Sequence, residues 1–231
     1  MGAVEIVKDV YMVGGPDLTD PKDAAVYLIN VGELLLIDSG AGNSVDAIAI
    51  SIDELGFNSR DLAAVILTHC HIDHIGGAPR FREAFGAKII MHERDAGPVE
   101  RGDPRMTAAS WYTIRFPPTR VDVALTAAEE RLRFGSGEVV CLHTPGHTPG
   151  SLSVYLDHDG KRILFGQDIH GPFYESLGSN LGLWRTSMQT LLALDADILC
   201  EGHFGIYQPK EKVRAYIEHY LEVYEDEDIW S

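Results

Sequence analysis

A short apolar run followed by a cluster of histidines constrains this chain more than any other feature. Ala63–Leu67 is apolar throughout, which predicts a buried strand. The next residues are Thr68-His69-Cys70-His71-Ile72-Asp73-His74, which follow the pattern His-x-His-x-Asp-His. Imidazole nitrogens and carboxylates are the groups that Zn²⁺, Mn²⁺ or Fe²⁺ coordinate. The sequence therefore predicts a metal site in this loop, with His69 and His71 facing one position and Asp73 and His74 facing a second.

The order of the apolar runs indicates the fold class. Each half of the chain places short strands first and helices last, which suggests two sheets packed face to face with helices outside. We therefore predict an α/β fold built as a four-layer αββα sandwich, in one domain that spans residues 1–231. The predicted strands are Val4–Val7, Tyr11–Val13, Ala25–Val31, Glu33–Ile37, Ala63–Leu67, Lys88–Met91, Arg131–Phe134, Glu138–Leu142, Ser151–Leu156, Arg162–Phe165 and Asp197–Cys200. The predicted helices cover 45–55, 79–85, 184–194 and 209–224.

Charge and composition exclude several classes of partner. The chain has 19 Lys and Arg against 35 Asp and Glu, a net charge of −16, whereas nucleic-acid phosphates and anionic membranes attract clustered cations. It has no apolar run of about 18 residues and no signal-peptide pattern at its N-terminus. Three cysteines, Cys70, Cys141 and Cys200, cannot all pair and are predicted to be buried free thiols. We therefore predict a cytoplasmic protein that binds neither nucleic acid nor a membrane.

Four further positions extend the histidine cluster into a family resemblance. His147 lies in Leu142-His143-Thr144-Pro145-Gly146-His147-Thr148-Pro149-Gly150-Ser151, and Asp168, His203 and Asp38 each follow a predicted strand. The chain resembles the metallo-β-lactamase superfamily over nearly its whole length. The resemblance implies the αββα sandwich of that superfamily and two divalent metal ions per chain, zinc first, with iron or manganese as alternatives.

The resemblance also assigns the ligands. It implies one metal on His69, His71 and His147 and another on Asp73, His74 and His203, with Asp168 bridging the two. Asp38 would orient the ligand imidazoles from behind. Outside this set, His92, His158 and His219 are expected at the surface, and Cys70 is expected to point away from the metals.

For function, the resemblance implies a metal-dependent hydrolase. A metal-bridging hydroxide would cleave an ester, thioester or lactone of a small molecule, with Asp73 and Asp168 as catalytic residues. Glyoxalase II enzymes, which cleave hydroxyacyl-glutathione thioesters, share Thr-His-x-His-x-Asp-His and Thr-Pro-Gly-His-Thr-x-Gly-Ser with this chain. They bind glutathione with basic residues, whereas the C-terminal segment here is acidic.

Other branches of the superfamily leave alternatives open. β-Lactamases of the commonest branch carry a cysteine where this chain has Asp168, and acyl-homoserine lactonases carry a tyrosine where it has Gly171. Persulfide dioxygenases share the Thr-His-Cys-His-x-Asp-His stretch but hold one iron, by analogy on His69, His147 and Asp168. A dioxygenase, a lactonase and a phosphodiesterase therefore remain alternatives to the thioesterase.

Residues 97–121 do not follow the strand and helix pattern, and their composition predicts a role in substrate specificity. Glycine and proline punctuate this segment, which also carries the large apolar side chains Met106, Trp111, Tyr112 and Phe116. We predict an insertion whose side chains roof the metal site and select an apolar or aromatic acyl group, joined in the pocket by His170, Phe173 and Tyr174. The alternative is that the insertion packs onto the body or onto a partner subunit, which leaves a homo-oligomer open.

Overall fold

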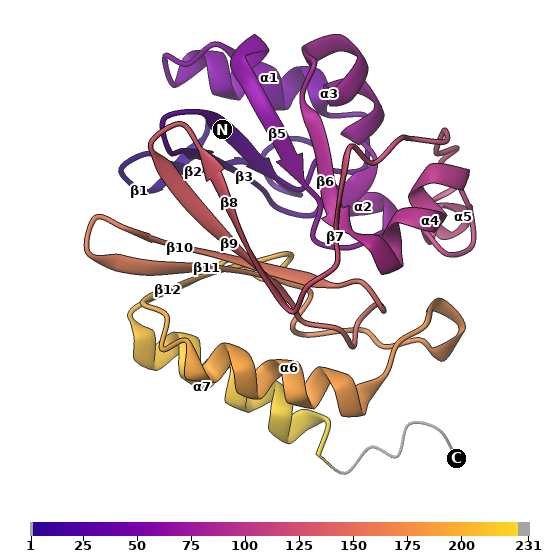
Figure 1. Ribbon diagram of the computed structural model, residues 1–231, viewed down its shortest axis with the longest axis vertical. Coiled ribbons are helices and arrows are strands. Elements are labelled where there is room, and N and C mark those ends of the chain that lie inside the picture. The colour runs from indigo at the N-terminus through magenta and orange to yellow at the C-terminus, as the bar shows by residue number, and fades with distance from the viewer. Residues whose placement is uncertain (1, 226–231) are drawn as a thin grey trace.

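The computed structural model describes residues 2–225 and has the predicted sandwich of two sheets between two layers of helices (Figure 1). Within these residues, the first sheet has seven strands in the order β1 to β7, and the second has six in the order β13-β12-β11-β10-β9-β8. The strands of the first sheet are β1 (Val4–Val7), β2 (Val10–Gly14), β3 (Val26–Asn30), β4 (Leu34–Ile37), β5 (Leu62–Ile66), β6 (Lys88–His92) and β7 (Val123–Leu125). Those of the second are β8 (Glu129–Phe134), β9 (Gly137–His143), β10 (Leu152–His158), β11 (Lys161–Gln167), β12 (Ile198–Glu201) and β13 (Ile206–Tyr207).

Helices cover the outer face of each sheet. The helices α1 (Val45–Glu54), α3 (Ala78–Phe85) and α4 (Glu93–Arg101) pack on the first sheet, and α6 (Leu181–Ala193) and α7 (Lys210–Val223) pack on the second. Two helices of one turn, α2 (Ile72–Ile75) and α5 (Ala109–Tyr112), lie in the connections. Within the described residues, no helix is long and apolar enough to cross a membrane.

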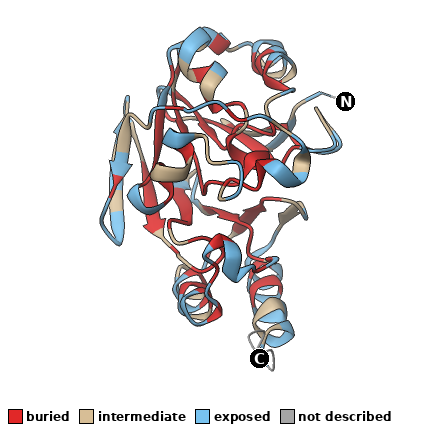
Figure 2. Cartoon of the chain, turned by 90° about the vertical axis from the view of Figure 1, so that its right-hand side faces the viewer, coloured by how far each residue is buried: buried red, intermediate tan, exposed pale blue. Residues whose placement is uncertain are grey.

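Strand alternation explains why the apolar runs have no polar face. In β4, Leu34 and Leu36 pack under the helices of the first sheet, whereas Leu35 and Ile37 point into the core between the two sheets. Successive side chains of a strand point to opposite faces, so a strand covered on both sides must be apolar at every position. Burial of a leucine of this kind contributes about 2 kcal/mol. The resulting red band of buried strands runs through the middle of Figure 2.

One part of the predicted insertion packs in the core of the protein, and another part lines the site. After α4, residues 102–122 pass through α5 and return to β7 at the edge of the first sheet. Phe116, predicted to line the pocket, is 5% exposed and packs with Val99 in the core under the helices. That prediction was wrong because a phenylalanine in a glycine- and proline-rich segment carries the same local pattern whether it faces a cavity or the core.

Candidate metal centre

Five strand ends bring the predicted ligands to one place. The ligand loop 67–71 follows β5 and leads into α2, whose single turn holds Asp73 and His74. His147 lies between β9 and β10, Asp168 directly follows β11, and His203 follows β12. Asp38 directly follows β4. Residues up to 165 positions apart in the sequence thus meet because their strands are neighbours in the two sheets.

The first ligand set consists of His69, His71, His147 and Asp168. Nε2 of His69 and Nε2 of His147 lie 3.1 and 2.9 Å from Nδ1 of His71. Oδ2 of Asp168 lies 3.4 Å from Nε2 of His147 and 3.8 Å from Nε2 of His69. All four side chains are buried, and their ligand atoms lie within 4.8 Å of one another. Three imidazoles and a carboxylate suit a tetrahedral divalent metal.

The second ligand set consists of Asp73, His74 and His203. Oδ2 of Asp73 lies 3.9 Å from Nε2 of His74 and 3.4 Å from Nε2 of His203. The other oxygen of Asp168, Oδ1, lies 3.2 Å from Nε2 of His74 and 3.4 Å from Nε2 of His203. Asp168 therefore turns Oδ2 toward the first ligand set and Oδ1 toward the second.

The buried polar atoms of this site fit divalent cations. Nε2 of His74 and Oδ1 of Asp168 are buried without a hydrogen-bond partner among the described residues, although each faces ligand atoms. Leaving such groups unsatisfied costs about 1–3 kcal/mol each. Burial is the main reason why the pKa of His71 falls to about 4 and that of His147 to about 3. Both imidazoles are therefore neutral near pH 7, with lone pairs free for a metal.

Electrostatics of the second set differ from those of the first. Burial alone would lower the pKa of His74, but the carboxylates of Asp168, Asp38 and Asp73 together raise it well above its ordinary value. Burial would likewise raise the pKa of Asp168, but His74 and His203 hold it well below the usual range. The second ligand set thus lies in a buried site where several carboxylates and imidazoles are close to one another.

Asp38 lies behind the ligands, as the resemblance implied. Its carboxylate accepts hydrogen bonds from the backbone N–H and hydroxyl of Thr68, both at 2.8 Å, and lies 2.7 Å from Nδ1 of His74. A proton on Nδ1 of His74 leaves Nε2 as the atom that faces the second set. Asp38 therefore fixes the ring orientation of one ligand and braces the start of the ligand loop.

Comparison with known proteins decides the family. The sequence profile of the Metallo-beta-lactamase superfamily matches residues 19–203. The chain belongs to this superfamily. A probable metallo-hydrolase of Methanocaldococcus jannaschii is 29% identical over 132 residues, which span 57% of this chain and 62% of that protein. A hydroxyacylglutathione hydrolase of Cereibacter sphaeroides is 29% identical over 197 residues, which span 83% of this chain and 66% of that protein. The matched regions thus cover somewhat less than two thirds of these two relatives.

Solved metallo-beta-lactamases share the fold. A metallo-beta-lactamase of Cronobacter sakazakii with a HARLDQ motif has a TM-score of 0.82 at 21% identity, covering 97% of this chain and 96% of that chain. A subclass B3 metallo-beta-lactamase of Bradyrhizobium japonicum has a TM-score of 0.77 at 23% identity, covering 97% and 92%. At these identities the likeness concerns the fold alone. Together with the sequence profile, it confirms the predicted superfamily and its αββα sandwich.

A cavity of about 130 Å³ opens onto both ligand sets of this superfamily site. Its walls include Trp111 and Tyr112 from α5 and Tyr174 after β11. The rings of Trp111 and Tyr174 meet edge to face, with their centroids 4.9 Å apart. Tyr112 also donates a hydrogen bond of 3.1 Å from its hydroxyl to Oδ2 of Asp73. The full lining is His71, Asp73, Ala108, Trp111, Tyr112, His147, Asp168, His170, Pro172, Tyr174 and His203.

Two other predicted pocket residues lie outside this lining. Phe173 is buried behind His147, with its ring centroid 6.1 Å from that imidazole and 5.2 Å from Trp184. Met106 is half-buried, and its carbonyl faces the thiol of Cys70 at 3.5 Å. The prediction was therefore wrong for Met106 and Phe173, because which way a loop side chain points is set by the neighbours it packs against.

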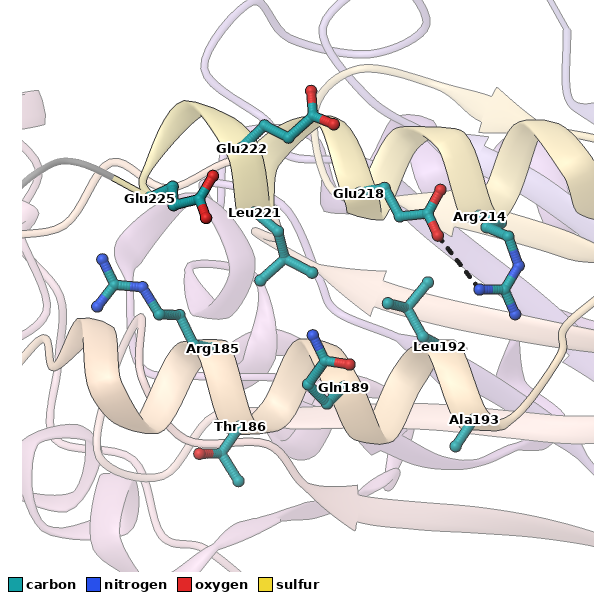
Figure 3. Close-up of a pocket in the computed structure, with 10 residues that line it drawn as sticks. All are labelled: Arg185, Thr186, Gln189, Leu192, Ala193, Arg214, Glu218, Leu221, Glu222 and Glu225. Atoms are coloured by element: carbon teal, nitrogen blue, oxygen red, sulfur yellow. Dashed lines mark hydrogen bonds and ion pairs between the residues drawn. The ribbon is translucent and has the colours of Figure 1, made fainter.

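A wider groove lies away from the metal centre. It measures about 820 Å³ and runs between α6 and α7, with Arg185, Leu192, Arg214 and Glu218 among the residues that line it (Figure 3). None of its lining residues belongs to either ligand set. The smaller cavity, and not this open groove, is therefore the candidate substrate site.

Sequence reasoning missed two buried acids around the site. Glu201 is fully buried, accepts hydrogen bonds from the backbone N–H groups of His203 and Phe204, and lies 2.8 Å from Nδ1 of His170. A charged residue that ends the apolar run Ile198-Leu199-Cys200 was an available signal. Asp95, in the first turn of α4, is also buried, but acids are common in exposed first turns, so its sequence carried no signal.

His92 is buried as well, which corrects its expected place at the surface.

Proposed function

We propose that this protein is a dinuclear metal-dependent hydrolase that cleaves an ester, thioester or lactone of a small molecule. One observation carries the proposal: the two carboxylate oxygens of Asp168 face different ligand sets, Oδ2 the histidines of the first and Oδ1 those of the second. A single tetrahedral ion would need only four ligands, whereas seven side chains converge here. We propose zinc for both positions, since imidazole and carboxylate ligands suit it.

In this proposal each residue has a defined part. His69, His71 and His147 would hold one ion, Asp73, His74 and His203 the other, and Asp168 both. Divalent ions in such sites lower the pKa of water and polarise a substrate carbonyl. Asp73 also lines the cavity, beside the position of the substrate, where its carboxylate can hold a proton for the leaving group.

The walls of the cavity support an acyl substrate with an apolar or aromatic group. Trp111, Tyr112, Pro172 and Tyr174 supply most of the apolar lining. A volume of about 130 Å³ is smaller than the ~300–1,000 Å³ of a site that encloses a whole drug-sized ligand. We therefore infer that the cavity takes the acyl part, while the leaving group extends to solvent. The hydroxyacylglutathione hydrolase among the relatives is consistent with a thioester.

Lactone hydrolysis is a second candidate because of Tyr112. The sequence has Gly171 where acyl-homoserine lactonases carry a tyrosine. In this chain the hydroxyl of Tyr112 comes from α5 instead and reaches Oδ2 of Asp73 at 3.1 Å. If its single hydrogen turned from Asp73 to a lactone carbonyl oxygen, this phenol would donate the kind of hydrogen bond that stabilises a developing oxyanion.

Metal analysis and a substrate panel test the proposal. Protein reconstituted with zinc, manganese or iron would be assayed against thioesters, lactones, phosphodiesters and glutathione persulfide, with Asp168→Ala as the inactive control. We expect about two ions per chain and hydrolysis of a thioester or lactone. One tightly held iron per chain, with oxygen uptake on glutathione persulfide, would instead establish the mononuclear dioxygenase. Free buried thiols at Cys70, Cys141 and Cys200 support the cytoplasm as the proposed compartment.

A further inference from the structure

A buried aspartate ties together the two loops that carry the first ligand set. Asp95 is 1% exposed, and Oδ2 accepts hydrogen bonds from the backbone N–H of Cys70 at 3.0 Å and the hydroxyl of Thr148 at 2.6 Å. Oδ1 accepts one from the backbone N–H of Gly150 at 2.7 Å. Cys70 lies between the ligands His69 and His71, and Thr148 directly follows the ligand His147. One carboxylate therefore spans the gap between the two ligand loops.

The approach of the second loop to Asp95 is unusually close. A Cβ atom on Gly150 would lie 2.6 Å from the backbone nitrogen of Asp95 and 2.7 Å from its Cγ. Any residue other than glycine would push this loop away from α4, so Gly150 allows the hydrogen bond at 2.7 Å. These three partners of Asp95 are donors, the thiol of Cys70 also lies beside its carboxylate, and within the described residues no lysine or arginine forms an ion pair with it. Among the described residues, the hydrogen bonds of this carboxylate therefore all go to the two ligand loops.

The segment that follows α4 supports the ligand loop from the same side. The backbone N–H of Ile72 donates to the carbonyl of Thr107 at 2.8 Å, and the thiol of Cys70 faces the carbonyl of Met106 at 3.5 Å. Asp95 and residues 106–107 therefore together form hydrogen bonds with residues 70 and 72, next to the ligand His71. Among the described residues, no hydrogen bond of Asp95 reaches α2, which holds His74, or the loop that holds His203.

We propose that Asp95 is a positioning residue that sets the spacing between His69, His71 and His147 and thereby the affinity of the first metal position. This inference rests on the metal centre proposed above. Residues that orient metal ligands from behind typically change metal affinity by about 10–100-fold when they are replaced. Because the hydrogen bonds that Asp95 accepts within the described residues all come from the loops of the first ligand set, its replacement should weaken that position and leave the second unchanged.

Site-resolved zinc titration tests this proposal. His203→Ala isolates the first ligand set and His147→Ala the second, so that each background reports one position in competition with a chromophoric chelator. We expect Asp95→Asn to weaken zinc binding at least tenfold in the His203→Ala background and less than twofold in the His147→Ala background. Asp23→Asn is the matched control, because Asp23 is 2% exposed and accepts hydrogen bonds from Thr19 and Ala41, outside the ligand loops.

Three results would contradict different parts of this proposal. Unchanged zinc affinity of Asp95→Asn in the His203→Ala background, with a lowered melting temperature, would make Asp95 a purely structural residue. Equal losses in both backgrounds, or equal losses for Asp95→Asn and Asp23→Asn, would refute the selective effect. Absence of zinc binding by the unaltered chain would refute the proposed metal centre itself.

A milder pair of variants decides the matter if Asp95→Asn does not fold. Thr148→Val replaces by a methyl group the hydroxyl that donates to Asp95 and also lies 2.8 Å from the hydroxyl of Ser151, whereas Thr148→Ser keeps both contacts. We expect a severalfold loss of zinc affinity at the first position for Thr148→Val and near-complete rescue for Thr148→Ser. Equal zinc affinities for the two variants would overturn the proposal.

Discussion

Replacing Trp111 by alanine tests the proposed substrate cavity most directly. Trp111 is 55% exposed, and its ring meets Tyr174 edge to face at 4.9 Å on the rim of the cavity. Loss of such an aromatic contact from an exposed position costs the fold only about 1 kcal/mol. None of the metal ligands contacts the indole through a ring pair or hydrogen bond among the described residues, so the metal content should stay the same.

The expected kinetic effect follows from the area that a bound acyl group would cover. An acyl group that buries about 60 Å² of apolar surface against the indole gains about 1.5 kcal/mol at ~25 cal/mol/Å². Trp111→Ala should therefore raise KM, or lower kcat/KM, by roughly tenfold on the best substrate of the panel.

Steady-state kinetics with a matched control complete the experiment. Ile50→Ala removes a side chain of similar exposure, 57%, from α1 on the outer helix layer and should leave kinetics unchanged. Trp111→Ala and Tyr112→Ala proteins with unaltered kinetics but a changed oligomeric state by analytical ultracentrifugation would show that residues 97–121 form an interface. The cavity would then not be the acyl site.

Three further predictions concern the ligands and their surroundings. Asp168→Ala should abolish hydrolysis and reduce bound zinc from two ions to one or none, with an unchanged circular dichroism spectrum; hydrolysis at the wild-type rate would exclude the bridging role. Tyr112→Phe removes the hydroxyl that reaches Asp73 and should lower kcat about tenfold at unchanged metal content, so an equal kcat would remove Tyr112 from the chemistry. Burial, then neighbouring His143, lowers the pKa of His92 to about 4, against about 6.5 in the unfolded chain. The unfolded state therefore binds the proton more readily, and this part of the stability is present above pH 6.5 and is lost as the pH falls toward 4. His92→Asn keeps an acceptor for the N–H of Arg94, so its free energy of unfolding by urea should fall less between pH 7 and pH 5 than that of the wild type; an equal fall would refute the assignment.

The sequence by itself determined the sandwich and the places of the ligands. Runs such as Leu34–Ile37 and Ala63–Leu67 are apolar at every position, which a strand tolerates only when both of its faces are covered. The histidine cluster directly follows one such run, and the resemblance to the superfamily assigned the remaining candidate ligands, which also follow predicted strands. The strand prediction depends on the order of apolar and polar residues along a short stretch, and the local sequence contains all of that information.

The tertiary structure alone decided which side chains face the site. Trp111 and Phe116 lie five positions apart in the same segment, yet one lines the cavity and the other packs in the core. Asp95 carries no signal in the sequence and Glu201 shows only that it ends an apolar run, but each accepts hydrogen bonds from loops that hold the candidate ligands. The division of Asp168 between two ligand sets likewise depends on His74, His147 and His203, which come from α2 and from two different loops. The direction of a loop side chain and the partner of a buried carboxylate are set by contacts with distant segments, and a local pattern does not record those contacts.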